Sequence, residues 1–130
     1  MTDAPQQKAL VMMAHGSRAA AANEEFLGLV DKIRSRDQTY DQIAGVFLEL
    51  AQPTLFEAIS KLSKDGITRF DIYPLFFNRG KHVNRDIPEQ IAAIKATHKE
   101  FEIRLLDYFG ASDELLAAVT SDIERQANSK

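Results

Sequence analysis

The sequence predicts an α/β fold, a four-stranded parallel sheet of strand order 2-1-3-4 with helices on both faces. Apolar runs typical of strands alternate along the chain with amphipathic segments typical of helices, which gives the pattern βαβαβαβα. Strands joined by helices run parallel through right-handed crossovers, and the doubly wound order is the natural arrangement of four of them. With 130 residues, the chain is expected to form one domain over residues 1–130.

The first strand and the first helix are predicted close to the N-terminus. Residues 9–14 form a continuous apolar run, as in a strand that is covered on both faces. An apolar stripe at helical spacing follows, made of Phe26, Leu29, Val30 and Ile33. Either Ser17 or Asn23 is expected to cap this helix, and the pattern does not choose between them.

The middle of the chain predicts two further strands with a helix between them. The second strand is expected over residues 43–50 and the third over residues 70–77. Pro74 has no N–H to donate to a neighbouring strand, so regular pairing should end there. Pro53 is expected to open the intervening helix, and Gly66 to end it. The buried stripe of that helix consists of Leu55, Ile59 and Leu62.

The C-terminal part predicts a helix, an edge strand and a last helix. Asp86 and Glu89 have the spacing of a capping box, with Pro88 in the first helical turn. The apolar face of this helix consists of Ile87, Ile91 and Ile94. Residues 101–105 alternate between apolar and polar, as expected at the edge of a sheet. The last helix carries Leu115, Leu116, Val119 and Ile123, and the polar ends, residues 1–7 and 126–130, are expected to be frayed.

The composition excludes several classes of function. Because there is no cysteine, disulfides, thiolate zinc sites and cysteine nucleophiles are excluded. The net charge of −3 gives no electrostatic reason to expect a nucleic-acid partner. The first residues lack the pattern of a signal peptide, and no apolar run is long enough to span a bilayer. We therefore expect a cytoplasmic protein without a membrane partner.

Two histidines follow strands that the predicted topology places side by side. His15 directly follows the first strand, and His82 follows the third strand after a short turn. In the order 2-1-3-4, the switch point lies between these two strands, and ligands bind there beyond the carboxyl ends. Glu49 ends the second predicted strand and can face the same edge. Two imidazoles and a carboxylate suit borderline divalent ions such as cobalt, nickel, iron or zinc, and leave coordination positions open.

Each of these residues also has an ordinary interpretation. A loop histidine can hydrogen-bond locally, and a glutamate at a strand end is usually solvated. The shared placement of His15 and His82 at one edge favours the metal site. His98, the third histidine, continues the stripe of Ile91 and Ile94 near a helix end, where a histidine usually packs or meets the helix dipole. We expect His98 to be structural.

Basic side chains are predicted around the proposed metal site. Gly16 permits a tight turn after the first strand, and the helix start that follows it can receive an anion. Each basic side chain alone is an ordinary solvated loop charge, and a serine in this turn is an ordinary capping residue. Together, in an acidic chain, they indicate a ligand that bears carboxylates or phosphates. The candidate substrate-binding residues are Ser17, Arg18, Arg79, Lys81 and Arg85.

Three segments in order carry a resemblance to a known family. They are Ala14-His15-Gly16-Ser17-Arg18, then Phe47-Leu48-Glu49 with Pro53 shortly after, then Pro74 to His82 running into Asp86-Ile87-Pro88. As an ordered set they resemble the class II tetrapyrrole chelatases, above all the short CbiX-type sirohydrochlorin cobaltochelatase and ferrochelatase group. The resemblance covers residues 10–88, with compatible helices after it.

The resemblance implies a metal chelatase, a lyase. It would insert a divalent metal, Co²⁺ first and Fe²⁺ or Ni²⁺ as alternatives, into sirohydrochlorin during cobalamin or sirohaem biosynthesis. His15 and His82 would bind the metal and help to remove the pyrrole protons, with Glu49 beside them. The metal would be a substrate, so no permanently bound cofactor is expected. Larger members carry two such domains around one cleft, which implies a homodimer for one copy. The segment directly before His82, residues 77–81, is larger and more charged than in many relatives. This difference bears on which tetrapyrrole the protein would bind.

Other classes of function fit less well. A histidine phosphatase requires an arginine directly before its first histidine, and Ala14 stands there. A receiver domain requires aspartates at the end of its first strand, and residues 12–14 supply none. A non-catalytic metal- or tetrapyrrole-binding protein is the remaining alternative, distinguished by stoichiometric binding without acceleration of metal insertion.

Overall fold

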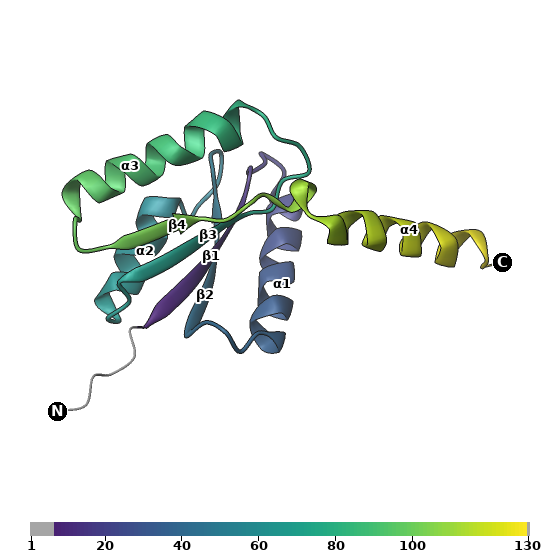
Figure 1. Cartoon of the computed structure of the whole chain (residues 1–130), viewed down its shortest axis with the longest axis horizontal. Coiled ribbons are helices and arrows are strands. Elements are labelled where there is room, and N and C mark those ends of the chain that lie inside the picture. The colour runs from purple at the N-terminus through teal and green to yellow at the C-terminus, as the bar shows by residue number, and fades with distance from the viewer. Residues whose placement is uncertain (1–6, 130) are drawn as a thin grey trace.

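The computed structural model describes residues 7–129 and contains a four-stranded sheet with helices on both faces (Figure 1). All strands run parallel in the order β2-β1-β3-β4, so the predicted fold class and strand order are confirmed. The strands are β1 (Lys8–Ala14), β2 (Gln42–Phe47), β3 (Arg69–Pro74) and β4 (Glu102–Leu105). The α-helices of the described part are α1 (Ala20–Arg36), α2 (Leu55–Lys64), α3 (Ile87–Thr97) and α4 (Asp113–Ala127). Two short turns, the π-helical η1 (His82–Asp86) and the 3-10 helical η2 (Phe109–Ala111), complete the order.

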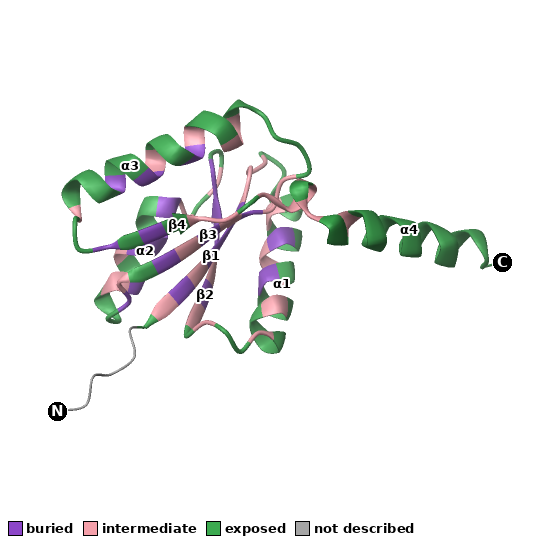
Figure 2. Cartoon of the chain, in the orientation of Figure 1, coloured by how far each residue is buried: buried purple, intermediate pink, exposed green. Residues whose placement is uncertain are grey.

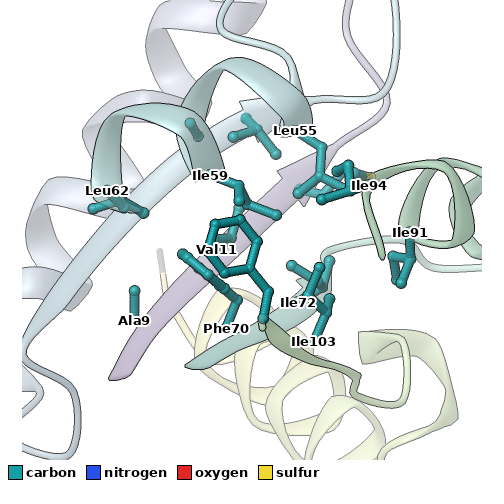
Figure 3. Close-up of a cluster of buried hydrophobic side chains, with 14 of the residues drawn as sticks. Ala9, Val11, Leu55, Ile59, Leu62, Phe70, Ile72, Ile91, Ile94 and Ile103 are labelled. Carbon is teal, nitrogen blue, oxygen red and sulfur yellow. The ribbon is translucent and has the colours of Figure 1, made fainter. Parts of the chain in front are cut away.

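Each face of the sheet has its own hydrophobic core, because successive strand residues point to opposite faces. On one face, α2 and α3 pack their predicted stripes on strand residues that include Val11, Phe70 and Ile72 (Figure 3). On the other face, α1 packs Phe26 and Val30 on β1 and β2. The strand residues beneath α1 are Met12, Ile43 and Phe47. Full burial of one large apolar side chain stabilises by about 1.5–3 kcal/mol, so both layers hold the sheet in place.

The start of α1 differs from the prediction. Its N-cap is Ala19, and no side chain caps it. Ser17 and Asn23 hydrogen-bond to each other instead. The Ser17 N–H donates to Asn23 Oδ1 over 3.0 Å, and Asn23 Nδ2 donates to the Ser17 carbonyl over 2.7 Å. The prediction that either residue caps α1 is wrong, because these polar groups close the preceding loop on itself.

The start of α2 also differs. Thr54 is the N-cap and forms a reciprocal capping box with Glu57, so the helix begins at Leu55. Pro53 lies before the cap and does not open the helix as predicted. The carbonyl of Pro53 accepts a hydrogen bond from the Phe47 N–H over 2.9 Å, which ties the loop to the end of β2.

The second and third strands are shorter than predicted. β2 ends at Phe47 rather than at residue 50, and β3 ends at Pro74 rather than at residue 77. The prediction that pairing ends at Pro74 is confirmed. Both strand ends were predicted too far along the chain because the apolar sequence continues past them. Leu48 is buried in a loop, and Leu75 and Phe76 pack against the two cores beyond the end of β3. Apolar character reports burial, and burial continues where pairing stops.

The third helix and the edge strand follow the prediction with one exception. Ile87, Ile91 and Ile94 are buried, Pro88 lies in the first turn of α3, and β4 forms the edge of the sheet. The predicted capping box of Asp86 and Glu89 is wrong. Asp86 belongs to η1 and makes no capping bond, because its carboxylate is engaged with His82.

The last helix is present, but it extends away from the rest of the chain and lies almost entirely in solvent (Figures 1 and 2). Leu116 is 72% exposed and Ile123 is 59% exposed. The helix continues through Gln126 and Ala127, two residues of the tail for which fraying is predicted. Of the other residues predicted to be frayed, 1–6 and 130 lie outside the described part. No helix within residues 7–129 is both long and apolar enough to cross a lipid bilayer.

Candidate metal site

Three loops that leave neighbouring strands meet at the carboxyl edge of the sheet. His15 directly follows β1, Glu49 lies two residues after the end of β2, and His82 is the first residue of η1. Because β1 lies between β2 and β3 and all three run parallel, their following loops reach the same edge. The fold thus brings together three residues that are far apart in the sequence, with Glu49 in a loop rather than in a strand.

The three side chains form one cluster. Nε2 of His15 lies 3.0 Å from Oε2 of Glu49, and the ring centroids of His15 and His82 lie 4.6 Å apart. One ligand atom from each residue lies within 4.8 Å of the other two. Ligand atoms around one tetrahedral ion stand about 3.4 Å apart, so side-chain adjustments on the order of 1 Å would let all three bind the same ion.

A glycine holds two of these loops together. Beyond the strand ends, the Leu48 N–H donates to the Ala14 carbonyl, and the Glu49 N–H donates to the His15 carbonyl over 3.1 Å. Gly16 has a φ of 101°, in the region that favours glycine, and a Cβ at this position would lie 1.8 Å from the Glu49 carbonyl oxygen. The close backbone approach fixes His15 and Glu49 relative to each other, and only glycine permits it.

A single π-helical turn sets the direction of His82. In η1, the Ile87 N–H donates to the His82 carbonyl, and the wide turn brings Asp86 beside the imidazole. Nδ1 of His82 lies 2.7 Å from Oδ2 of Asp86. The hydrogen bond from His82 lowers the pKa of Asp86, and the charges of His82, Arg85 and Lys81 act in the same direction. Asp86 is predicted as a helix cap from its spacing to Glu89, although its four-residue spacing from His82 equally indicates that these two side chains share a helix face.

Both imidazoles are oriented through Nδ1. Nδ1 of His15 lies 3.2 Å from the Gly16 carbonyl oxygen, and Nδ1 of His82 faces the Asp86 carboxylate. Both partners are acceptors, so an N–H on Nδ1 would be satisfied in each ring, and Nε2 is the nitrogen left for a metal. In His15 this Nε2 faces Glu49. A metal-binding histidine usually has this arrangement, in which an oxygen acceptor fixes the tautomer and increases the basicity of the other nitrogen.

The cluster is open to solvent on one side. The side chains of His15 and Glu49 are 43% and 50% exposed, and that of His82 is 32% exposed. Phe76 packs edge-on against His15 with ring centroids 6.3 Å apart and closes another side. A site with three protein ligands and an open face can exchange its metal with a large ligand, whereas a structural site would enclose the ion with four ligands.

The predicted substrate-binding residues lie in the same loops. Ser17 and Arg18 follow the Gly16 turn, and Ser17 Oγ accepts a hydrogen bond from the Ala19 N–H. Arg79 and Lys81 are exposed in the loop before η1, and the guanidinium of Arg79 lies over the ring of Tyr108 at 5.9 Å. Arg85 is exposed within η1. Exposed basic side chains therefore stand in two of the three loops that form the cluster.

His98 stands outside this cluster. It is the C-cap of α3, and its ring stacks on that of Phe101 with centroids 4.9 Å apart. The expectation that this histidine packs near a helix end is confirmed.

A comparison with protein families agrees with this geometry. Residues 9–126 match the model of the CbiX family, which is nearly the whole chain. The chain belongs to the CbiX family. The family resemblance inferred from the three sequence segments is confirmed.

Curated relatives in this family carry names for two metals. The chain is 30% identical over 92 residues to a sirohydrochlorin cobaltochelatase of Methanocaldococcus jannaschii, which covers 71% of this chain and 64% of that relative. It is 26% identical over 109 residues to a sirohydrochlorin ferrochelatase of Priestia megaterium, which covers 83% of this chain and 40% of that relative. The chain spans less than two thirds of the length of both relatives.

A solved structure has the same fold. The sirohydrochlorin chelatase SirB of Bacillus subtilis subspecies spizizenii, solved in complex with cobalt, matches with a TM-score of 0.83 and 25% identity. The match covers 92% of this chain and 51% of that chain. The matched part of this chain therefore spans about half the length of that chain.

Proposed function

We propose that this protein inserts a divalent metal into sirohydrochlorin, with Co²⁺ as the first candidate and Fe²⁺ or Ni²⁺ as alternatives. The cluster of His15, Glu49 and His82 is the observation that carries the proposal. Its nitrogen and oxygen donors suit these ions, and its family relatives are named for cobalt and iron. The reaction would take place in the cytoplasm, and the metal is a substrate that the protein releases in every cycle.

The two imidazoles would bind the ion through Nε2, with Glu49 as the third ligand. In the metal-free arrangement, Nε2 of His15 and Oε2 of Glu49 lie 3.0 Å apart, close enough for a proton on either atom to form a hydrogen bond to the other. A metal ion that binds both atoms competes with such a proton. We therefore expect metal binding to release a proton and to weaken as the pH falls.

Insertion requires two pyrrole N–H protons to leave as the metal enters the macrocycle. A ligand that releases the metal regains a lone pair, and that lone pair can accept a pyrrole proton. His82 is best placed for this exchange, because the Asp86 carboxylate at Nδ1 stabilises the imidazolium that forms when Nε2 takes a proton. A base within hydrogen-bond reach contributes about 10²–10⁴-fold to such a step.

The basic side chains around the cluster would bind the acidic side chains of the tetrapyrrole. Sirohydrochlorin carries many carboxylates, and Arg18, Arg79, Lys81 and Arg85 provide the complementary charge. Ser17 would add a hydroxyl in the same turn. The charged loop segment of residues 77–81 would then help to determine which tetrapyrrole binds.

Anaerobic incubation with sirohydrochlorin and Co²⁺ or Fe²⁺, followed by absorbance, tests the proposal. We expect many turnovers per protomer, and at least about a 100-fold loss of rate in His15→Ala and His82→Ala. His98→Ala is the matched control and should retain the rate, because His98 lies outside the cluster. Rates no better than the spontaneous reaction with Co²⁺, Fe²⁺ and Ni²⁺ would reject catalysis. Stoichiometric binding without acceleration would instead identify a metal or tetrapyrrole carrier.

A further inference from the structure

One peptide group connects the segments that carry the three members of the metal cluster. It is the peptide between Leu48 and Glu49. Its N–H, which belongs to Glu49, donates to the His15 carbonyl over 3.1 Å. Its carbonyl, which belongs to Leu48, accepts a hydrogen bond from Nε2 of Gln90 over 3.3 Å. Because the N–H and C=O of a trans peptide point in opposite directions, this peptide lies between the His15 loop and α3.

The Leu48 carbonyl depends on the side chain of Gln90 for its hydrogen bond. No backbone N–H within residues 7–129 donates to this carbonyl. Leu48 is a buried residue, and a carbonyl that loses its partner in such surroundings is unfavourable. Because the partner is an acceptor, the amide of Gln90 must present its nitrogen rather than its oxygen to it.

Gln90 lies on the helical face that carries His82. The residues His82, Asp86 and Gln90 follow one another at intervals of four, and η1 continues directly into α3. Side chains at this spacing stand one above the other on one face of a helix. This face therefore directs the imidazole of His82 to the metal cluster and, further along, the amide of Gln90 to the peptide that carries Glu49.

The pairing of the strands does not by itself fix His82 relative to the other two residues. The register of β3 with β1 ends at Pro74, and residues 75–81 separate that point from His82. Residues 77–81 of this connection are exposed. Within the described part of the chain, the bond from Gln90 is the only hydrogen bond that joins η1 or α3 to the loops after β1 and β2.

We infer that Gln90 is a positioning residue that holds Glu49 at the distance from His82 at which one ion reaches both. The inference rests on the proposed metal site and adds a residue that does not touch the metal. The three ligand atoms lie within 4.8 Å of one another, whereas ligands around one tetrahedral ion stand about 3.4 Å apart. The site is therefore already near its outer limit, and a loop released from α3 would carry Glu49 beyond the reach of an ion bound to His82.

The surroundings of Gln90 permit a substitution that removes only the hydrogen bond. Gln90 lines an apolar groove of about 440 Å³ between α2 and α3, together with Leu48, Phe56 and Thr97. Methionine has nearly the length of glutamine, adapts to irregular apolar surroundings and carries no hydrogen-bond donor. Gln90→Met therefore keeps the packing of the groove and leaves the Leu48 carbonyl without its donor.

Calorimetric titration of the purified full chain with Co²⁺, without tetrapyrrole, tests the inference. We expect Gln90→Met to bind Co²⁺ about 10-fold more weakly than the wild type, the lower end of the usual effect of a residue that supports a metal ligand. Thr97→Val is the matched control. Thr97 lines the same groove, but its hydroxyl donates to the Ile94 carbonyl within its own helix, so this variant should bind like the wild type. An unchanged affinity in Gln90→Met would overturn the inference.

A double-mutant cycle with Glu49→Ala distinguishes positioning from a general effect on the fold. The effects of independent residues on the binding free energy add, whereas residues that act through each other deviate from additivity. If Gln90 acts by placing Glu49, the loss of Co²⁺ affinity caused by Glu49→Ala should be about 10-fold smaller in Gln90→Met than in the wild type. Equal losses in the two backgrounds would contradict the positioning role.

The same titrations separate this inference from the proposed reaction. His15→Ala and His82→Ala should each weaken the binding of Co²⁺, and binding that depends on neither histidine would overturn both the metal site and the role of Gln90. Coupling between Gln90 and Glu49 in a chain that binds Co²⁺ but inserts no metal would reject catalysis alone and support the role of Gln90.

Discussion

The hydrogen bond between His82 and Asp86 shows how one side chain outside the predicted set determines what a metal ligand can do. The carboxylate accepts from Nδ1 over 2.7 Å, so the lone pair of His82 that faces the cluster is at Nε2. A ring that can rotate would lose part of its metal affinity to the entropy of ordering. Asp86 is therefore a positioning residue, which acts on the metal through His82.

Replacement of Asp86 by alanine should weaken Co²⁺ binding by about 10–100-fold, the usual effect of removing such a partner. Asp86→Asn keeps an oxygen acceptor for Nδ1–H but loses the charge, so it should bind Co²⁺ nearly as well and lose turnover instead. Calorimetric titration with Co²⁺ and the insertion assay separate these two effects. Glu89→Ala, at the other end of the supposed capping box, is the control and should change neither. Co²⁺ affinity of Asp86→Ala equal to that of the wild type would contradict the positioning role.

Between elements, a polar network holds β3, β4 and the loop before β2 together on the face that α1 covers only in part. The Tyr40 hydroxyl donates to Asp71 over 2.6 Å, and Arg104 donates two hydrogen bonds to the same carboxylate. Burial alone would raise the pKa of Asp71, but the hydrogen bonds from Arg104 and Tyr40 outweigh it and lower that pKa. Burial, together with the bond to Asp71, raises the pKa of Tyr40 to about 12.

Tyr40→Phe should lower the free energy of unfolding by about 1 kcal/mol at pH 7, because one hydrogen bond to a carboxylate is lost. The folded-state pKa of Tyr40 lies above the unfolded value of about 10, so its contribution is complete below pH 10 and is lost as the pH rises towards 12. The difference between the variant and the wild type should therefore narrow by pH 11. Urea unfolding at pH 7 and pH 11 measures it, with Tyr108→Phe, which lies outside this network beside Arg79, as the control. A difference that stays constant between these pH values would show that the hydroxyl bond is not responsible.

At the scale of the whole molecule, the sequence predicted the fold and the meeting of His15, Glu49 and His82 because both follow from the order of elements. Apolar periodicity identifies which faces are buried, and parallel strands then deliver their loops to one edge. Strand ends were predicted poorly, because Leu48 and Leu75 remain in apolar surroundings after pairing stops. Asp86 was misassigned because a capping box and a side-chain pair to His82 share the same residue types.

The position of α4 could not be predicted for a different reason. An apolar stripe has the same sequence pattern whether it packs on its own sheet or on another copy. The direction of α4 depends on the backbone contact of Gly110 with Phe76 and Phe77, which is made between residues far apart in the chain. Such contacts form only in the folded chain, so no local sequence pattern predicts them.

The central claim is that the folded molecule joins His15, Glu49 and His82 around one divalent ion that it can pass on. Anomalous diffraction from a crystal soaked with Co²⁺ tests this claim most directly. We predict one strong peak at the cluster, with Nε2 of both histidines and an oxygen of Glu49 about 2.0–2.2 Å from the ion and at least one position open. Cobalt bound elsewhere, or a soaked crystal in which His15 and His82 remain unligated, would contradict the account.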